Sequence, residues 1–308
     1  ADMDGLPIRE ENDLPFRSEN GCMHACGHDA NMAVLLGTAR LLKIFQSELK
    51  GTVKLIFEAG EETSEGAPSL IRDGVLEAPH VDLMLSMHVD TERHGAARGG
   101  LVVREGVTHA SCDDFYLVLH GKGGHGGKPH LSTDPVPAMA AFINNGQYLL
   151  TRENYALDPA VMTFGGIRTS SYATNIIPDR VELCGTIRCS KESQRRIIRK
   201  RFREILNDIC HAHRVIPELV ISEGEPPVHS DPEAQELLIK AAADLFGSGA
   251  VTTFREQTMG SEDIGYFFER VPGAILRYCF LTEAADGTLY PIHSEKMMMD
   301  DSGLWKVS

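Results

Sequence analysis

The spacing of apolar and polar residues divides the first part of the chain into alternating strands and helices. Residues 31–46 carry apolar side chains three and four positions apart, which predicts an amphipathic helix, with Asp29 placed to cap its start. Residues 52–59 are apolar and β-branched, which predicts a buried strand, and a short helix at 68–75 and a second buried strand at 81–87 follow. Strands that alternate with helices favour a mostly parallel sheet with helices on both faces.

The pattern changes after residue 111. Phe115, Leu117 and Leu119 alternate with residues that face the other way, as in a strand of a different, half-buried sheet. Further strands are predicted at 161–167, 180–189 and 215–222, and helices at 134–150 and 192–213. This order suits a smaller α+β domain with an antiparallel sheet.

Two prolines, Pro226 and Pro227, mark the return of the chain to the first domain, where helices at 231–246 and 262–268 and a strand at 273–280 are predicted. A chain of 308 residues usually forms two domains rather than one. We therefore predict an α/β domain made of residues 1–111 and 225–308, and an inserted α+β domain made of residues 112–224.

Composition limits the classes of partner. The formal charge of −14 disfavours nucleic acid and anionic membrane surfaces, because binding there depends on Lys and Arg. No apolar run approaches the roughly 18 residues that a membrane span needs. The first residues show no signal peptide, so a cytoplasmic location is the default. Seven scattered cysteines do not form the dense, even framework of a small secreted domain, and we expect most of them to be reduced and buried.

The chemistry concentrates first in residues 22–29, which read CMHACGHD. Four interpretations are open for this motif: a redox pair of Cys22 and Cys26, a structural zinc clip, half of a catalytic metal site, or a reactive-cysteine loop. A thioredoxin-like pair has two intervening residues, and this pair has three. The redox interpretation is therefore the weakest.

More candidate ligands fall at predicted strand ends, where open α/β sheets build their sites. Each is weak alone, and their joint placement is what indicates a site. Thiolate, imidazole and carboxylate together favour a borderline divalent metal such as zinc, with manganese, cobalt or nickel as alternatives, and the set is too large for one tetrahedral ion. The candidates are Cys26, His28, Glu61, Glu62, His88 and His293.

Several motifs then occur in the order seen in one family. The chain resembles the amidohydrolase branch of the aminoacylase and glutamate carboxypeptidase family, which includes hippurate hydrolases, N-acyl-L-amino acid amidohydrolases and indole-acetyl amino acid hydrolases. The resemblance spans nearly the whole chain. The motifs are ADMDGLP at 1–7, HACGHD at 24–29, EE at 61–62 with GA at 66–67, MHV at 87–89, GKGGH at 121–125, NIIP at 175–178, GSED at 260–263 and HS at 293–294.

The resemblance implies a role for each matching residue of the metal site. It implies that Glu61 is the general base, and that an aspartate near the first ligands supports the site, which suggests Asp2 or Asp4, and Asp29. Two divalent ions that share a water can lower its pKa and polarise the scissile carbonyl. The implied ligands are Cys26, His28, Glu62, His88 and His293.

The resemblance also implies that the inserted domain is a lid and dimerisation domain. His125 matches a residue that stabilises the tetrahedral oxyanion, and Asn175 and Arg188 match residues that hold the substrate carboxylate, in several members across a dimer. A planar guanidinium suits a carboxylate, and a donor near the metals suits a developing anion. We therefore expect a homodimer formed through the smaller domain.

The principal hypothesis is a metal-dependent amidohydrolase that cleaves N-acyl amino acids or related small conjugates. Family members usually carry additional N-terminal and C-terminal segments that this sequence lacks, and its first residues are expected to form a core strand. The alternative is therefore a catalytically silent relative that binds a small carboxylate or acts as a dimerising scaffold. The acyl group and the amino acid do not follow from the sequence.

Overall fold

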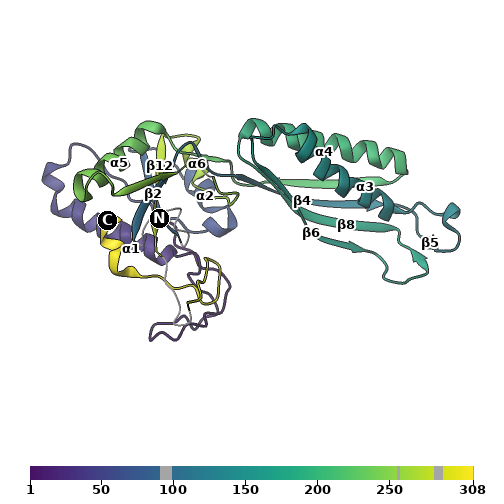
Figure 1. The fold of residues 1–308 in the computed structure, drawn as a ribbon, viewed down its shortest axis with the longest axis horizontal. Helices are drawn as coiled ribbons and strands as arrows, with labels where there is room; N and C mark the ends of the chain where they lie inside the picture. The colour runs from purple at the N-terminus through teal and green to yellow at the C-terminus, as the bar shows by residue number, and fades with distance from the viewer. Residues whose placement is uncertain (91–98, 255–256, 281–286, 308) are drawn as a thin grey trace. The chain divides into compact units, whose positions relative to one another are not determined.

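The computed structural model describes residues 1–90, 99–254, 257–280 and 287–307 (Figure 1). The chain divides into two compact units. Unit 1 consists of Ala1–Thr108, His229–Glu256 and Asp263–Ser308, and unit 2 consists of His109–Val228 and Gln257–Glu262. The paired strands β3 (Val107–His109) and β10 (Val228–His229) lie where the chain passes from one unit to the other.

Unit 1 is built on a mixed four-stranded sheet in the order β1-β12-β2-β11. The strand β1 is parallel to β12 and β11 is parallel to β2, whereas β12 and β2 are antiparallel. Figure 1 shows α5 above these strands and α1 below them. This arrangement confirms the predicted α/β class. The bounds are β1 Met84–Asp90, β2 Gly100–Arg104, β11 Val251–Phe254, β12 Gly273–Cys279, α1 His28–Ile44 and α5 Pro232–Phe246.

The remaining described elements of unit 1 are short. The core of unit 1 contains residues from near both ends of the given sequence, because Met23 and Met297 belong to one buried cluster with Val89 of β1. The short elements are η1 Gln46–Glu48, η2 Glu61–Thr63, α2 Gly66–Arg72, α6 Gly265–Phe268 and η5 Asp301–Val307.

The predicted strand at residues 52–59 is wrong, and so is the predicted core strand at the start of the chain. Asp2 and Glu58 form only an isolated parallel bridge, and Val53 is 51% exposed. A strand is stable only when neighbouring strands satisfy its backbone along its length, and no such ladder joins these segments in the described structure. The apolar pattern was correct, but it did not reveal whether a neighbour was present.

The helix that follows the motif at 22–29 starts earlier than predicted. Gly27 is the N-cap residue of α1, with a left-handed backbone at φ 89°, and its position has no side-chain cap. The prediction that Asp29 caps the helix is therefore wrong. Asp29 lies within the first turn, and its Oδ1 accepts a hydrogen bond from the Ala30 N–H at 3.0 Å.

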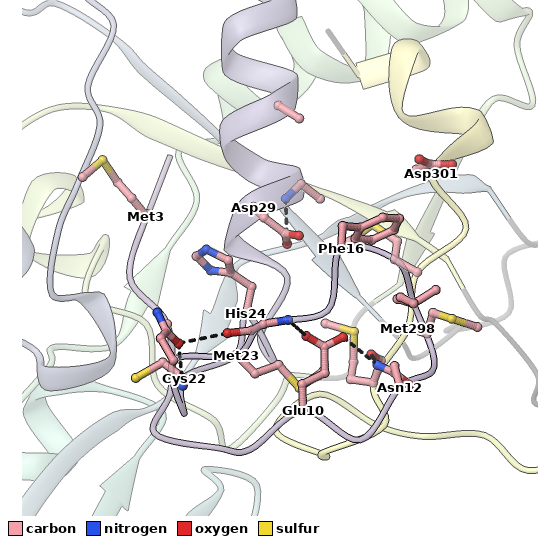
Figure 2. A pocket seen from close by; sticks show the side chains of 18 of the residues that line it. Met3, Glu10, Asn12, Phe16, Cys22, Met23, His24, Asp29, Met298 and Asp301 are labelled. Atoms are coloured by element: carbon pink, nitrogen blue, oxygen red, sulfur yellow. Dashed lines mark hydrogen bonds between the residues drawn. The ribbon is translucent and has the colours of Figure 1, made fainter.

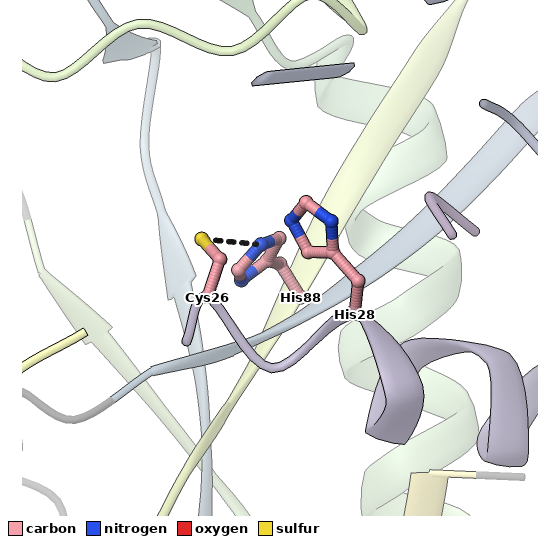
Figure 3. Close-up of side chains that lie close together, drawn as sticks. All are labelled: Cys26, His28 and His88. Carbon is pink, nitrogen blue, oxygen red and sulfur yellow. Dashed lines mark hydrogen bonds between the residues drawn. The ribbon is translucent and has the colours of Figure 1, made fainter. Parts of the chain in front are cut away.

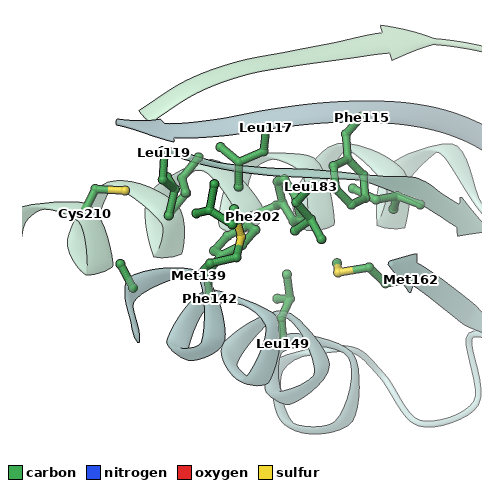
Figure 4. Packing of buried hydrophobic residues seen from close by; sticks show 14 of the residues in the cluster. Phe115, Leu117, Leu119, Met139, Phe142, Leu149, Met162, Leu183, Phe202 and Cys210 are labelled. Atoms are coloured by element: carbon green, nitrogen blue, oxygen red, sulfur yellow. The ribbon is translucent and has the colours of Figure 1, made fainter. Parts of the chain in front are cut away.

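Unit 2 is an α+β unit with an antiparallel sheet in the order β6-β8-β4-β9. Phe115, Leu117 and Leu119 point from β4 into a core formed with the helices, as their alternation predicts (Figure 4). The predicted helix at 192–213 is confirmed with the same bounds. The elements are β4 Ser111–His120, β6 Ala160–Thr169, β8 Arg180–Cys189, β9 Ile216–Glu223, α3 Pro135–Tyr148, α4 Glu192–His213, η4 Leu149–Glu153, η3 Pro129–Leu131, β5 Gly124–His125 and β7 Ile176–Ile177.

The described structure contains neither a membrane-spanning helix nor a disulfide. Among the described residues, every helix is too short or too polar to cross a membrane. All seven cysteines lie in the described part of the chain and none forms a disulfide, so Cys22 and Cys26 are not joined.

Candidate metal centre

Three of the predicted ligands converge in the interior of unit 1. Cys26 precedes α1, His28 begins it, and His88 lies within β1 rather than at its end. The Cys26 Sγ lies 3.8 Å from the His88 Nε2, and the rings of His28 and His88 lie 5.5 Å apart, nearly perpendicular (Figure 3). One ligand atom from each of the three residues falls within 4.8 Å of the other two, and all three residues are buried.

A second group of ligands contains the same cysteine. Cys26, Glu62 and His293 also place one ligand atom each within 4.8 Å of the others, and the His293 Nε2 lies 3.4 Å from the Glu62 Oε1. His293 is held by its backbone, because its N–H donates to the Ala25 carbonyl at 2.8 Å. The five predicted ligands therefore form two groups of three that share Cys26. Three protein ligands leave a coordination position open, as in catalytic zinc sites.

The two buried histidines are oriented by backbone carbonyls. The His28 Nδ1 lies 3.0 Å from the Asp4 carbonyl oxygen, and the His88 Nδ1 lies 2.5 Å from that of Val89. A carbonyl can only accept, so each Nδ1 carries the proton and each Nε2 keeps its lone pair for the cluster. This is the usual way in which a metal-binding imidazole is fixed.

Asp2 lies against both histidines. Its Oδ2 is 3.4 Å from the His28 Nε2 and 3.7 Å from the His88 Nε2, while its Oδ1 accepts a hydrogen bond from the Asn31 side chain at 2.7 Å. Burial opposes ionisation of Asp2, but His88, His28 and Asn31 outweigh it and hold the pKa of Asp2 below its usual range. Asp2 therefore supplies negative charge at the cluster.

Asn31 is a site residue that the sequence analysis missed. It is buried, and its Oδ1 accepts from the Val89 N–H at 3.1 Å while its Nδ2 holds Asp2. The available signal was a polar residue three positions after His28, on the same face of an otherwise apolar helix. Asn31 therefore connects α1, β1 and the N-terminal segment.

The other predicted aspartates differ in position. Asp4 accepts from the Glu62 N–H at 3.0 Å through Oδ2, and its Oδ1 lies 3.3 Å from the His28 Nδ1. Asp4 thus joins the first ligand segment to the acidic pair. Asp29 is exposed, and the only hydrogen bond of its side chain in the described structure is to Ala30.

The pKa shifts of the ligand side chains His88 and Glu62 favour the protonation states that bind a metal cation. Burial lowers the pKa of His88, which favours the neutral imidazole that binds metal. Burial raises the pKa of Glu62, but its contacts with His293, His28 and Cys26 together outweigh this and the net shift is downward. The contact between Glu62 and His293 also raises the pKa of His293. A metal ion would take the place of the proton that these two side chains share.

The residues fit a pair of divalent ions. Among the described residues, the buried atoms His28 Nε2 and Asp4 Oδ1 have no hydrogen-bond partner, and the buried Glu62 Oε1 has only the 3.4 Å ion-pair contact with His293. Buried polar atoms without a partner are rare in folded proteins, and each needs a cause. Two of these atoms are ligand atoms that face the cluster, where a cation would satisfy both. Glu61 lies beside them, with its Oε2 3.9 Å from the His28 Nε2.

In unit 2 the structure brings His125 and Asn175 together. The strands β5 and β7 pair His125 with Ile176, and the Gly126 N–H donates to the Asn175 carbonyl at 2.8 Å. His125 is exposed, and its Nδ1 accepts from the Gly127 N–H at 3.0 Å, so its proton lies on Nε2.

Arg188 lies elsewhere in unit 2. It is near the end of β8, where its Nη1 donates to the Met259 carbonyl at 2.9 Å, whereas Asn175 and His125 lie beyond the start of that strand at Arg180. The rise of a strand makes Arg180 and Arg188 roughly 26 Å apart. One small substrate cannot contact Arg188 and the His125–Asn175 pair of the same chain.

Comparison with known proteins agrees with this geometry. The model of peptidase family M20/M25/M40 matches residues 1–303. The chain belongs to this family. It is therefore a metal-dependent hydrolase of amide bonds, as the motifs predict.

Three similar proteins illustrate the family. The N-acetylcysteine deacetylase of Bacillus subtilis is 36% identical over 274 residues, which cover 89% of this chain and 70% of that protein. The N-acetyldiaminopimelate deacetylase of Lactococcus lactis is 31% identical, with 99% of this chain and 77% of that protein covered. The crystal structure of the YXEP protein of Bacillus subtilis, a dinuclear metal-binding peptidase of family M20, superposes with a TM-score of 0.81 at 30% identity, covering 100% of this chain and 77% of that one.

Proposed function

We propose that the chain hydrolyses the amide bond of N-acyl amino acids or related small amide conjugates, releasing a carboxylate and an amino acid. The observation that carries the proposal is the pair of three-ligand groups that share Cys26, with Glu61 beside the same cluster. The two deacetylases described above support the substrate class. The two groups contain all five residues predicted as ligands, which argues against a catalytically silent relative.

The five ligands would hold two divalent ions. Thiolate, imidazole and carboxylate ligands suit zinc, and manganese, cobalt or nickel are acceptable alternatives. When bound, the ions would lower the pKa of a water molecule and polarise the scissile carbonyl. A cytoplasmic location stays a prediction.

Side chains of the protein carry out proton transfer, oxyanion stabilisation and substrate binding. Glu61 takes the proton of the attacking water and returns it to the departing amine nitrogen. His125, which carries its proton on Nε2, donates a hydrogen bond to the developing oxyanion. Arg188 and Asn175 bind the substrate carboxylate. Asp2, Asp4 and Asn31 orient the metal-binding side chains.

We further propose that unit 2 is the lid and dimerisation domain and that the active enzyme is a homodimer. The separation of Arg188 from His125 and Asn175 within one chain supports this proposal, because all three can act on one substrate only if they come from two copies. The edge strands β6 and β9 offer backbone groups for pairing around a two-fold axis.

The general base is tested by Glu61→Gln, which keeps the size of the side chain and removes its basicity. We expect amine release from a panel of N-acyl amino acids to fall by about 100- to 10,000-fold. Metal content, measured by elemental analysis with zinc, manganese, cobalt or nickel supplied in turn, should stay the same. The exposed Glu65→Gln is the matched control and should keep full activity. Wild-type turnover in the Glu61 variant would reject the assignment.

Sharing of residues between two copies is tested by mixing inactive variants. Glu61→Gln and His125→Ala chains are each expected to be inactive alone. A mixed dimer would contain one site with both native residues if His125 acts across the dimer, so coexpression should restore activity. If the mixed dimers form and remain inactive, His125 does not act across the dimer.

A further inference from the structure

Unit 1 contains a cavity that the proposed reaction does not use. Its volume is about 740 Å³, and it is lined by the N-terminal loop, the start of α1 and the segment that leads into η5 (Figure 2). Neither the five metal ligands nor Glu61 line it. The cavity is therefore a separate site, large enough for a small organic molecule.

The charged groups that are described in the lining of the cavity are acidic. Among the residues that the structure describes, Glu10, Asp29 and Asp301 line it, and neither Lys nor Arg does. Within the described structure, Glu10 accepts hydrogen bonds from two neutral donors, the Asn12 side chain at 3.2 Å and the Ser18 N–H at 2.9 Å. In the part of the chain that the structure describes, none of the three carboxylates forms an ion pair with a cationic side chain. Their combined charge therefore favours a cation inside the cavity.

The rest of the wall is mostly apolar and adaptable. Phe16 lines the cavity with 79% of its surface exposed, and the face of its ring can attract a cation. Thioether side chains are flexible and polarizable, so they fit apolar groups of different shapes. The methionines of the lining are Met3, Met23, Met297, Met298 and Met299.

We propose that this cavity binds an organic cation with an apolar body, such as an alkylammonium or arylalkylammonium ion. The ammonium group would lie among the carboxylates and the hydrocarbon chain against the thioethers. The charge of such a ligand is opposite to that of the carboxylate substrates proposed for the metal centre. The inference therefore does not depend on the proposed function.

The binding experiment uses the full chain with [¹³C-methyl]methionine labels and n-hexylammonium as the probe. Saturable shifts of the methionine methyl signals are expected, because five methionines line the cavity. Hexanol tests the contribution of the apolar body and should bind at least about tenfold more weakly, since it lacks the charge. Hexanoate should not bind. Equal affinity for hexanol, or any saturable binding of hexanoate, would overturn the proposal.

The double variant Glu10→Gln with Asp301→Asn tests the same point from the protein. Hexylammonium affinity should fall by at least about fivefold, and hexanol affinity should not change. The matched control is Asp73→Asn with Asp82→Asn, which removes the same charge at exposed positions outside the cavity. If both double variants lose affinity equally, the effect is the net charge of the chain and the proposed site is wrong.

Discussion

Cys26 and Cys22 are four positions apart in the motif, but they differ in burial and in their neighbours, which indicates different roles. Cys26 is buried, and its sulfur belongs to both ligand groups, whereas Cys22 is exposed and belongs to neither. The sequence left a redox pair, a structural zinc clip, half of a catalytic metal site and a reactive-cysteine loop open, because the motif has the same composition in each case. The contacts with His88, Glu62 and His293 favour the catalytic metal site.

Replacing Cys26 by Ala should therefore affect both metal positions. We expect metal content to fall from two ions per chain to fewer than one, and turnover to fall by at least about 100-fold. Mutation of a residue that only hydrogen-bonds to a ligand already lowers metal affinity or activity by about 10- to 100-fold, and loss of the ligand itself should cost more. Cys22→Ala is the matched control and should keep both ions. Elemental analysis after dialysis measures the difference. Two retained ions in the Cys26 variant would show that its thiolate is not shared.

At the scale of elements, the short helix η2 depends on Gly60, the N-cap residue that precedes it. Gly60 has a left-handed backbone at φ 96°, and its carbonyl oxygen accepts hydrogen bonds from the Glu65 and Gly66 N–H groups at 3.2 and 3.0 Å. This turn brings both Glu61 and Glu62 towards the His28 Nε2, at 3.9 and 4.0 Å, and places the Glu62 Oε1 3.4 Å from the His293 Nε2 as well. The backbone of one residue thus sets the position of the proposed base and of a ligand.

Gly60→Ala should strain this turn. A side chain in the left-handed region costs roughly 1–2 kcal/mol of unfolding free energy. Gly74→Ala is a matched control, since Gly74 has φ 80° and open space around it. Chemical denaturation should show similar losses of stability in the two variants. Turnover should fall only in Gly60→Ala, and an equal fall in both would mean that the turn does not position Glu61.

The elements that the sequence predicted well are those whose pattern is long or repeats. The helix α4 and the strand β8 have the predicted bounds, because 22 residues at helical spacing and 10 residues with an alternating buried face are hard to misread. Residues 52–59 have an equally apolar composition but no strand ladder. Pairing depends on distant neighbours, which a local pattern does not contain.

At the scale of the whole molecule, the metal centre joins distant parts of unit 1. Asp4 contacts His28 and Glu62, while His293 is held by Ala25, so the ligand segments meet only in the folded unit. The ligand types were readable from the sequence, but the shared position of Cys26 and the role of Asn31 were not. Both depend on which side chains become neighbours after folding.

Metal binding should therefore stabilise unit 1 rather than unit 2. An ion present at 100 times its Kd adds about 2.7 kcal/mol, which corresponds to roughly 5–10 °C for a unit of this size. Calorimetry with and without EDTA should show one transition that moves downward on chelation and one that does not. A Cys26→Ala chain should respond less to EDTA. Two transitions that move together would show that the ions do not act on unit 1 alone.

Gly27, between the two ligands Cys26 and His28, gives the motif a requirement that is independent of metal chemistry. A Cβ atom at this position would lie 2.4 Å from the Val89 Cγ2, and its backbone at φ 89° already disfavours any other residue. In a saturation library selected for activity, position 27 should return glycine as strictly as positions 26 and 28 return their ligands. Intolerance to substitution alone would then suggest that three adjacent residues bind metal, although Gly27 only leaves room for Val89 of β1.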